Sequence, residues 1–144
     1  MVLDSIRFVQ KERSLTLFAF VIMEHHLHLI ASNDHLTKTI KEFKSFTARS
    51  IIDYLKERNS VSILQKLKHA KLAHKTESNY QIWQEGSHPQ EIHSEEMLMQ
   101  KIGYIHNNPV RRGYVDEPKQ WRYSSAMNYE GEQGLLDVTT DWRN

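Results

Sequence analysis

The chain has 144 residues, of which 39% are hydrophobic and 26% are charged, and it contains only five glycines and three prolines. Such a balance is typical of one folded domain and excludes a disordered or fibrous protein. The absence of cysteine excludes disulfides and thiolate zinc sites, and the formal net charge of +1 gives no support by itself for a nucleic-acid partner.

The first part of the chain predicts a helix, two strands and a long helix. Residues 4–13 are typical of the end of a helix. The β-prone run from Leu15 to Met23 and the run from Leu27 to Ala31 are separated by only three residues, which indicates two adjacent antiparallel strands. Apolar residues then recur at helical spacing from Leu36 to Leu55, so we expect a long helix that ends near Asn59.

The middle of the chain predicts a second helix and a hairpin. The helix runs from Ser60 towards His74, and its later part carries a run of lysines between Lys66 and Lys75. Residues 80–92 indicate two short strands around a turn that contains Gly86 and Pro89, and this segment would form either a small hairpin or an irregular flap.

The last part predicts one more long helix and a tail. Ser94, followed by two glutamates, suits the start of a helix that we expect to stop before Pro109. Residues 121–129 suit one or two helical turns, and residues 131–144 indicate a loosely ordered tail. Residues 1–130 would then form a single domain.

The sequence carries no signal for a membrane or for export. No apolar run approaches the roughly 20 residues that cross a bilayer, and the N-terminus lacks the apolar stretch of a signal peptide. We therefore expect a cytoplasmic protein that has no membrane partner.

The first candidate site residues are His26 and His28, at the start of the second predicted strand. Side chains alternate between the two faces of a strand, so both imidazoles lie on one face while Leu27 points into the core. Two nitrogen ligands can then converge on one metal ion. The alternative is a solvated strand face without a ligand.

The second candidate pair is Tyr104 and Asn108, which lie four residues apart and share one face of the predicted helix. A phenol and an amide oxygen would then lie side by side. The alternative is a core tyrosine with a solvated hydroxyl and an asparagine that only ends the helix before a proline.

Several short sequence words join these candidates into one pattern. In their order they resemble the HUH (His-hydrophobe-His) single-tyrosine transposases, especially the REP-associated tyrosine transposases of bacteria. The resemblance spans roughly residues 15–129 and is carried by Val21-Ile22-Met23, His26-Leu27-His28-Leu29, Lys44-Ser45-Phe46-Thr47-Ala48-Arg49, Trp83-Gln84-Glu85-Gly86, Tyr104-Ile105-His106-Asn107-Asn108-Pro109-Val110 and Trp121-Arg122-Tyr123-Ser124-Ser125-Ala126.

The chain departs from the family pattern in two places. Glu24 and His25 stand where the family usually has proline and asparagine. The family pattern also begins with an additional strand and part of a helix upstream of Met1. The resemblance therefore implies an α+β, ferredoxin-like antiparallel sheet that lacks the usual first strand, with helices on one face and the histidine pair on a central strand.

The resemblance also implies a mechanism. Tyr104 would attack a phosphodiester of single-stranded DNA and form a 5′-phosphotyrosine link, which a later step rejoins. His26 and His28 would hold Mg²⁺ or Mn²⁺ against the scissile phosphate, with Asn108 as a third ligand.

Basic residues are expected to bind the phosphates of single-stranded or hairpin DNA. Charge runs are also often no more than solvated faces. The aromatic rings of Tyr80 and Trp83 would either stack on unpaired bases or pack in the core. The candidate DNA-binding residues are Lys41, Lys44, Arg49, Lys68, Lys71, Arg111 and Arg112.

Two rival functions share most of these expectations. The first is a catalytically inactive or domesticated DNA-binding module of the same fold. The second is a metal-dependent hydrolase in which water attacks and Tyr104 only orients the substrate. The pattern also leaves open a monomer or a homodimer that exchanges Tyr104 between subunits.

Overall fold

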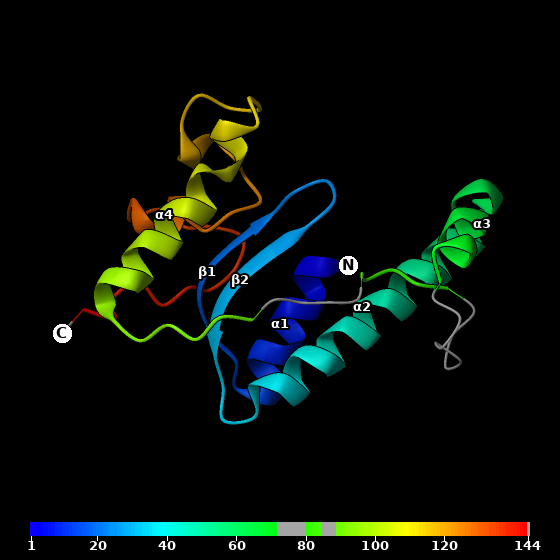
Figure 1. Ribbon diagram of the computed structural model, residues 1–144, viewed down its shortest axis with the longest axis horizontal. Coiled ribbons are helices and arrows are strands. Elements are labelled where there is room, and N and C mark those ends of the chain that lie inside the picture. The colour runs from blue at the N-terminus through cyan, green and yellow to red at the C-terminus, as the bar shows by residue number, and fades with distance from the viewer. Residues whose placement is uncertain (72–79, 85–88, 144) are drawn as a thin grey trace.

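The computed structural model describes residues 1–71, 80–84 and 89–143 (Figure 1). The fold is α+β, as the sequence predicted, and it combines one antiparallel sheet with helices packed on it. In chain order the elements are α1 (Val2–Arg13), β1 (Thr16–Ile22), β2 (Leu27–Ser32), α2 (Leu36–Glu57), α3 (Val61–His69), α4 (Glu95–Arg111), the short 3-10 helix η1 (Pro118–Gln120) and α5 (Ala126–Tyr129).

Strand β1 pairs with β2 in a two-stranded sheet and makes a further backbone contact along its other side. On one side it pairs antiparallel with β2, where Val21 lies opposite His28. On the other side Val21 forms an isolated bridge with Ser124, and the amide of Ile22 donates to the carbonyl of Tyr123 at 2.8 Å. In the described part of the chain the sheet has only these two strands, so the histidine pair lies at the start of an edge strand, whereas the resemblance implied a central strand.

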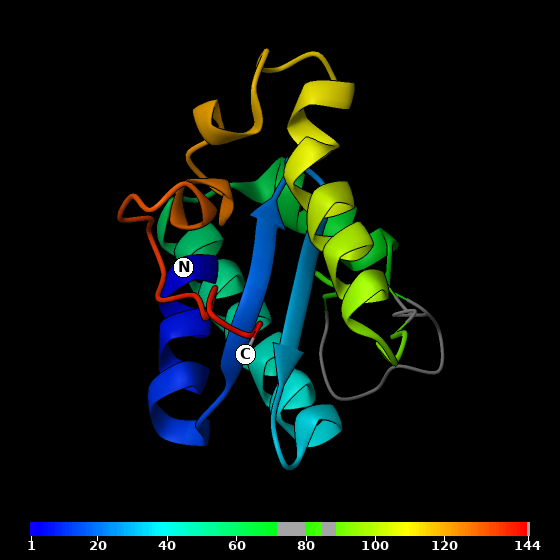
Figure 2. The same cartoon turned by 90° about the vertical axis from the view of Figure 1, so that its left-hand side faces the viewer.

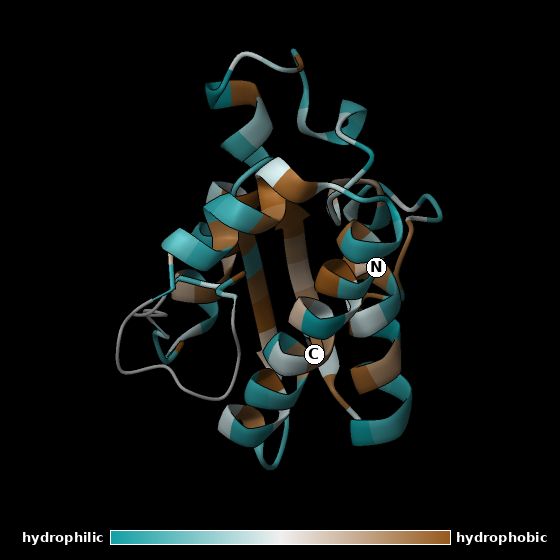
Figure 3. Cartoon of the chain, turned by 90° about the vertical axis from the view of Figure 1, so that its right-hand side faces the viewer, coloured by the Kyte–Doolittle hydropathy of each residue, from teal (hydrophilic) through white to brown (hydrophobic). Residues whose placement is uncertain are grey.

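Helices cover both faces of the sheet, whereas the resemblance implied one face. Leu17 and Phe20 of β1 pack with Ile6 of α1 and Phe43 of α2, while Ala19 and Val21 pack with α4 on the opposite face. Figures 1 and 2 show the strands between α4 and the α1–α2 pair. The first strand is apolar on both sides, so both faces need a cover; Figure 3 shows the strands mostly brown and the outer helix surfaces mostly teal.

A β-bulge explains how β1 serves both faces. The pairing register shifts between Leu17 and Ala19. An extra residue in one strand resets the alternation of side chains. Leu17 and Phe20 therefore reach the same core cluster although they lie three residues apart.

Helix α4 begins as predicted, because the side chain of Ser94 accepts a hydrogen bond from the amide of Met97 at 3.1 Å. It continues past Pro109 to Arg111, whereas the sequence predicted an end before the proline. Proline lacks the N–H that would bond to the preceding turn. Pro109 is almost completely buried, so its packing offsets the lost hydrogen bond.

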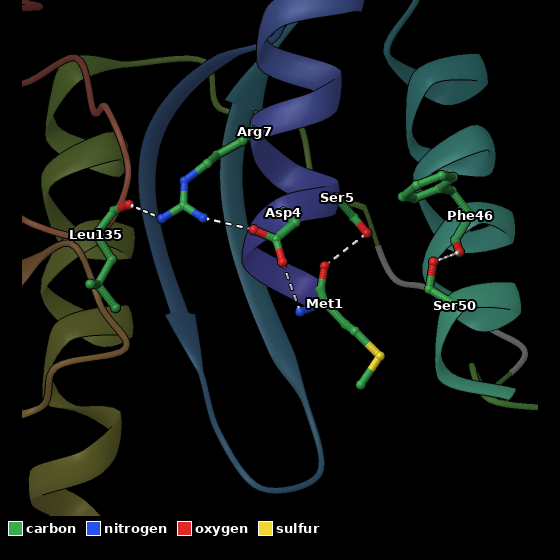
Figure 4. A network of polar contacts seen from close by, with 7 residues as sticks. All are labelled: Met1, Asp4, Ser5, Arg7, Phe46, Ser50 and Leu135. Carbon is green, nitrogen blue, oxygen red and sulfur yellow. Dashed lines mark hydrogen bonds and ion pairs between the residues drawn. The ribbon is translucent and has the colours of Figure 1, made fainter. Parts of the chain in front are cut away.

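The segment after α5 is attached to the core. The sequence had instead predicted a loosely ordered tail. Leu136 is buried in the same cluster as Ile6, and the amide of Thr139 donates to the carbonyl of Leu17 at 2.8 Å. Figure 4 shows Arg7 of α1 donating to the carbonyl of Leu135, at 2.8 Å. Burial of one leucine side chain contributes about 2 kcal/mol, so this segment stabilises the domain.

Of the two alternatives for residues 80–92, the hairpin is wrong for residues 80–84 and 89–92, which contain no strand and are irregular. Gly86 lies outside the described residues. The part of the predicted second helix and of its lysine run that begins at residue 72 also lies outside them. Trp83 packs against Phe43, with ring centroids 5.8 Å apart, and its Nε1 donates to the hydroxyl of Thr47 at 3.0 Å. Trp83 is therefore partly buried against the core.

A buried polar contact fixes α4 to the sheet. His106 Nε2 lies 2.8 Å from Ser125 Oγ, and the same hydroxyl accepts the amide N–H of Phe20 at 2.9 Å. Burial lowers the pKa of His106 from its ordinary value of 6.5 to about 4. His106 is therefore neutral at pH 7 and acts in packing.

We expect this histidine to make folding sensitive to acid. Between pH 6.5 and about 4 the unfolded chain binds a proton at His106 that the folded chain does not. The free energy of unfolding therefore falls as the pH is lowered through this range, by about 3 kcal/mol in all from this group. Urea unfolding at a series of pH values should show a weaker acid dependence for His106→Gln than for wild type. The exposed control His25→Gln should keep the wild-type slope, and an equal slope in His106→Gln would contradict the assignment.

Candidate functional site

An open pocket of about 190 Å³ lies where the start of β2 meets the C-terminal half of α4. It is small and polar, so it suits an ion and a phosphate group better than an apolar ligand. Its lining residues are His26, His28, Tyr104, Asn108, Arg111 and Arg112.

The two imidazoles lie next to each other as the strand pattern predicted. The ring centroids of His26 and His28 are 4.9 Å apart, and the rings are nearly perpendicular, at 77°. Leu27 packs against the core on the α1–α2 side of the sheet. The histidines therefore face α4 together, because alternate residues of a strand share a face.

Tyr104 and Asn108 complete the pocket from α4. The Tyr104 ring meets the His28 ring edge-on, with centroids 6.0 Å apart. Asn108 Nδ2 lies 3.4 Å from His26 Nε2. Asn108 is only 5% exposed, whereas Tyr104 is 51% exposed, so the amide is held inside the protein while the phenol is accessible to a large substrate.

Two arginines at the end of α4 make the rim of the pocket positive. The guanidinium carbon of Arg111 lies 4.1 Å from the centroid of the Tyr104 ring, a distance that gives a favourable cation–π contact. These residues are seven positions apart, about two helical turns, and so lie on one face. This contact exists only because α4 continues past Pro109.

The surroundings keep both imidazoles neutral. Burial, and then the positive charge of Arg112, lower the pKa of His26 below 6.5. Burial, then His26 and Arg111, lower the pKa of His28. A neutral imidazole has a free nitrogen lone pair, which is the form that binds a metal.

The donor set fits a hydrated divalent cation. Two imidazole nitrogens face the pocket, and rotation of the Asn108 amide would bring its oxygen beside them. Among the residues that the structure describes, no cluster of three His, Cys, Asp or Glu side chains is found, so water or substrate oxygens would have to complete the coordination. The arginines repel a lone cation, and an anion such as phosphate would balance the charge.

The other predicted DNA-binding residues do not line this pocket. Helix α2 lies across the sheet from α4 (Figures 1 and 2). Three of these residues are on α2, one is on α3 and one follows α3, namely Lys41, Lys44, Arg49, Lys68 and Lys71.

The sequence patterns missed the contact that positions the pocket. His106 and Ser125 lie nineteen residues apart, and no local periodicity relates them. Both belong to the words that carry the family resemblance, which was the only signal available for them.

Comparison with known proteins adds no relative. A scan against protein-family models, a search of curated proteins and a search of solved structures each find no match to this chain. No helix in the described ranges is long and apolar enough to cross a membrane.

The two arginines give a matched test of the electrostatics. Replacing Arg112 by glutamine should raise the pKa of His26, because one of its positive neighbours is lost. Arg111→Gln should instead raise the pKa of His28. NMR titration of the imidazole protons in both variants measures the effects. The arrangement would be refuted if both substitutions left both histidines unchanged.

Proposed function

We propose that this protein cleaves and rejoins single-stranded DNA through a covalent link to Tyr104, with the help of a divalent metal. One observation carries the proposal: the phenol, two neutral imidazoles and a buried amide converge in one pocket, although His26 and Asn108 are 82 residues apart in the sequence. The choice of DNA as the substrate and of a transposase-like reaction follows from the family resemblance.

The proposed step exchanges one phosphodiester for another. Tyr104 Oη attacks phosphorus and loses its proton, the new Tyr–O–P bond forms, and the bond from phosphorus to the 3′ oxygen breaks. The leaving oxygen takes up a proton and becomes a 3′-hydroxyl. A later attack by a 3′-hydroxyl reverses the step and regenerates the tyrosine, so no water is consumed.

His26, His28 and Asn108 would hold the cation in this proposal. When bound, Mg²⁺ or Mn²⁺ would act as a Lewis acid on a non-bridging phosphate oxygen. Two imidazole ligands suit Mn²⁺ better than Mg²⁺, which prefers oxygen. Arg111 and Arg112 would bind the same phosphate from the other side of the pocket.

The single-stranded substrate would continue beyond the pocket. Contacts with phosphates outside the pocket are proposed for the remaining basic residues, and these contacts would weaken with salt. Tyr104 lies in the same pocket as the imidazoles of its own chain, so we propose cleavage without exchange of Tyr104, and a homodimer that exchanges this residue stays an alternative. The basic residues proposed for the phosphate contacts outside the pocket are Lys41, Lys44, Arg49, Lys68 and Lys71.

A cytoplasmic location stays a prediction.

Substitution of the nucleophile provides the decisive test. With a labelled hairpin-bearing single strand and Mn²⁺, wild type should form a covalent protein–DNA product that survives denaturing electrophoresis. Tyr104→Phe should form none, because it lacks the attacking oxygen, yet it should bind the DNA almost as tightly. Tyr54→Phe, at an exposed tyrosine on α2, should behave as wild type.

Two outcomes would favour the rival functions. Nicked DNA without covalent product, in wild type and Tyr104→Phe alike, would identify a hydrolase. Binding with no cleavage in any variant would identify an inactive DNA-binding module.

The metal ligands can be tested against a neighbouring histidine. His26→Ala and His28→Ala should each lose most of the Mn²⁺-dependent covalent capture, by a factor of roughly 10 to 100 or more. His25→Ala should keep it, because His25 is exposed and does not line the pocket. Capture at increasing Mn²⁺ concentrations measures the effect. Equal capture by all three variants would contradict the proposed ligand set.

A further inference from the structure

Beside the pocket, the chain that follows α4 carries a cluster of three aromatic rings, Tyr114, Trp121 and Tyr123. The rings of Tyr114 and Trp121 are stacked, with centroids 5.5 Å apart and an angle of 23° between planes. Tyr123 meets Trp121 nearly perpendicularly, at 6.4 Å. We refer to these three residues as the aromatic cluster.

The backbone holds the aromatic cluster firmly. Trp121 Nε1 donates to the carbonyl of Ile22 at 3.0 Å, and the carbonyl of Tyr123 accepts the amide of Ile22 at 2.8 Å. The amide of Tyr114 donates to the carbonyl of Pro109 at 3.0 Å. The end of β1 and the end of α4 therefore fix the ring of Trp121 and the backbone of the two tyrosines.

Core packing does not account for the two tyrosines. Tyr114 is 42% exposed and Tyr123 is 47% exposed, while Trp121 beneath them is only partly exposed. Such an arrangement leaves aromatic surface facing solvent although both tyrosine rings rest against the ring of Trp121. Rings that are ordered in advance lose little entropy when a flat ligand stacks on them.

The position of the aromatic cluster links it to the proposed site. Tyr114 follows the pocket residue Arg112 by two positions, and Ile22 lies four residues before the pocket residue His26. The carboxylate of Glu24, in the turn that leads to His26, lies beside the hydroxyl of Tyr114 and raises its pKa. The rings and the pocket therefore share one end of the β1–β2 hairpin.

The charges around the aromatic cluster indicate what binds there. In the sequence, Arg112 precedes the first tyrosine and the exposed Arg122 lies between Trp121 and Tyr123. The carboxylate of Glu24 lies at the hydroxyl end of Tyr114, so a phosphate would approach from the arginines. Aromatic rings with cations between them suit a strand that offers both base faces and phosphates. A duplex would hide its base faces, and an apolar protein surface would leave the arginines unpaired.

We propose that the aromatic cluster binds an unpaired nucleobase next to the phosphate held in the pocket. The inference rests on the proposed function for its polymer, single-stranded DNA, and adds a recognition site beside the reacting atoms. One base would stack on Tyr114 or Tyr123, and its phosphate would contact Arg112. The site would select unpaired DNA by base stacking.

Binding without cleavage tests this proposal separately from the nuclease. A fluorescent oligothymidylate and an abasic oligonucleotide of equal length and charge are titrated with protein in EDTA, and anisotropy gives the affinities. Wild type should bind the base-bearing strand about tenfold more tightly or better, because each stacked base adds roughly 5- to 100-fold. Tyr114→Leu and Tyr123→Leu should lose much of this preference and keep the affinity for the abasic strand.

Matched variants exclude a folding effect. Tyr114→Phe and Tyr123→Phe keep the rings and should keep the preference. Tyr54→Leu removes an equally exposed tyrosine from α2, where Arg58 lies over its ring, and should also keep it. If one leucine variant does not fold, the other still shows whether the preference depends on the aromatic cluster.

The results separate the two proposals. Equal affinity of wild type for both strands, no binding to either, or an unchanged preference in folded leucine variants would overturn the nucleobase site. A base preference that depends on the aromatic cluster would support this site even if Tyr104 forms no covalent product. Covalent capture without a base preference would support the nuclease proposal and overturn the proposal of a nucleobase site.

Discussion

The pocket depends on the attachment of α4 to the β1–β2 hairpin. The hairpin brings the imidazoles and α4 brings Tyr104 and Asn108, and the chain passes through α2 and α3 between them. The buried contact of His106 with Ser125, whose hydroxyl also receives the amide of Phe20, sets the rotation of the helix. Because each helical residue turns by about 100°, a shift of one position would turn the phenol out of the pocket.

The pocket combines two charge preferences that normally exclude each other. Its imidazoles are kept neutral by burial and by the two arginines, so they can donate lone pairs to a cation. The same arginines disfavour a cation that arrives alone. An ion and an anionic strand would therefore bind cooperatively, because each reduces the electrostatic cost of the other.

Short-range spacing was enough to predict which side chains share a face. The alternation of side chains along a strand predicted that His26 and His28 share a face. The helical repeat predicted the same for Tyr104 and Asn108, because both periods are local properties of the backbone. The meeting of the two pairs depends on tertiary packing, and only the resemblance suggested it. The helix end before Pro109 was wrong for the same reason, since burial of the ring compensates for a local cost of about 3 kcal/mol.

The burial of Leu136 bears on the order in which this protein can be made. Its core partners on α1 and β1 leave the ribosome long before residue 136 is synthesised. Until then a patch of apolar surface stays uncovered, which exposes the nascent domain to aggregation and to chaperones. The hairpin and helices can form early, but the core cluster is completed only after residue 136 has been synthesised.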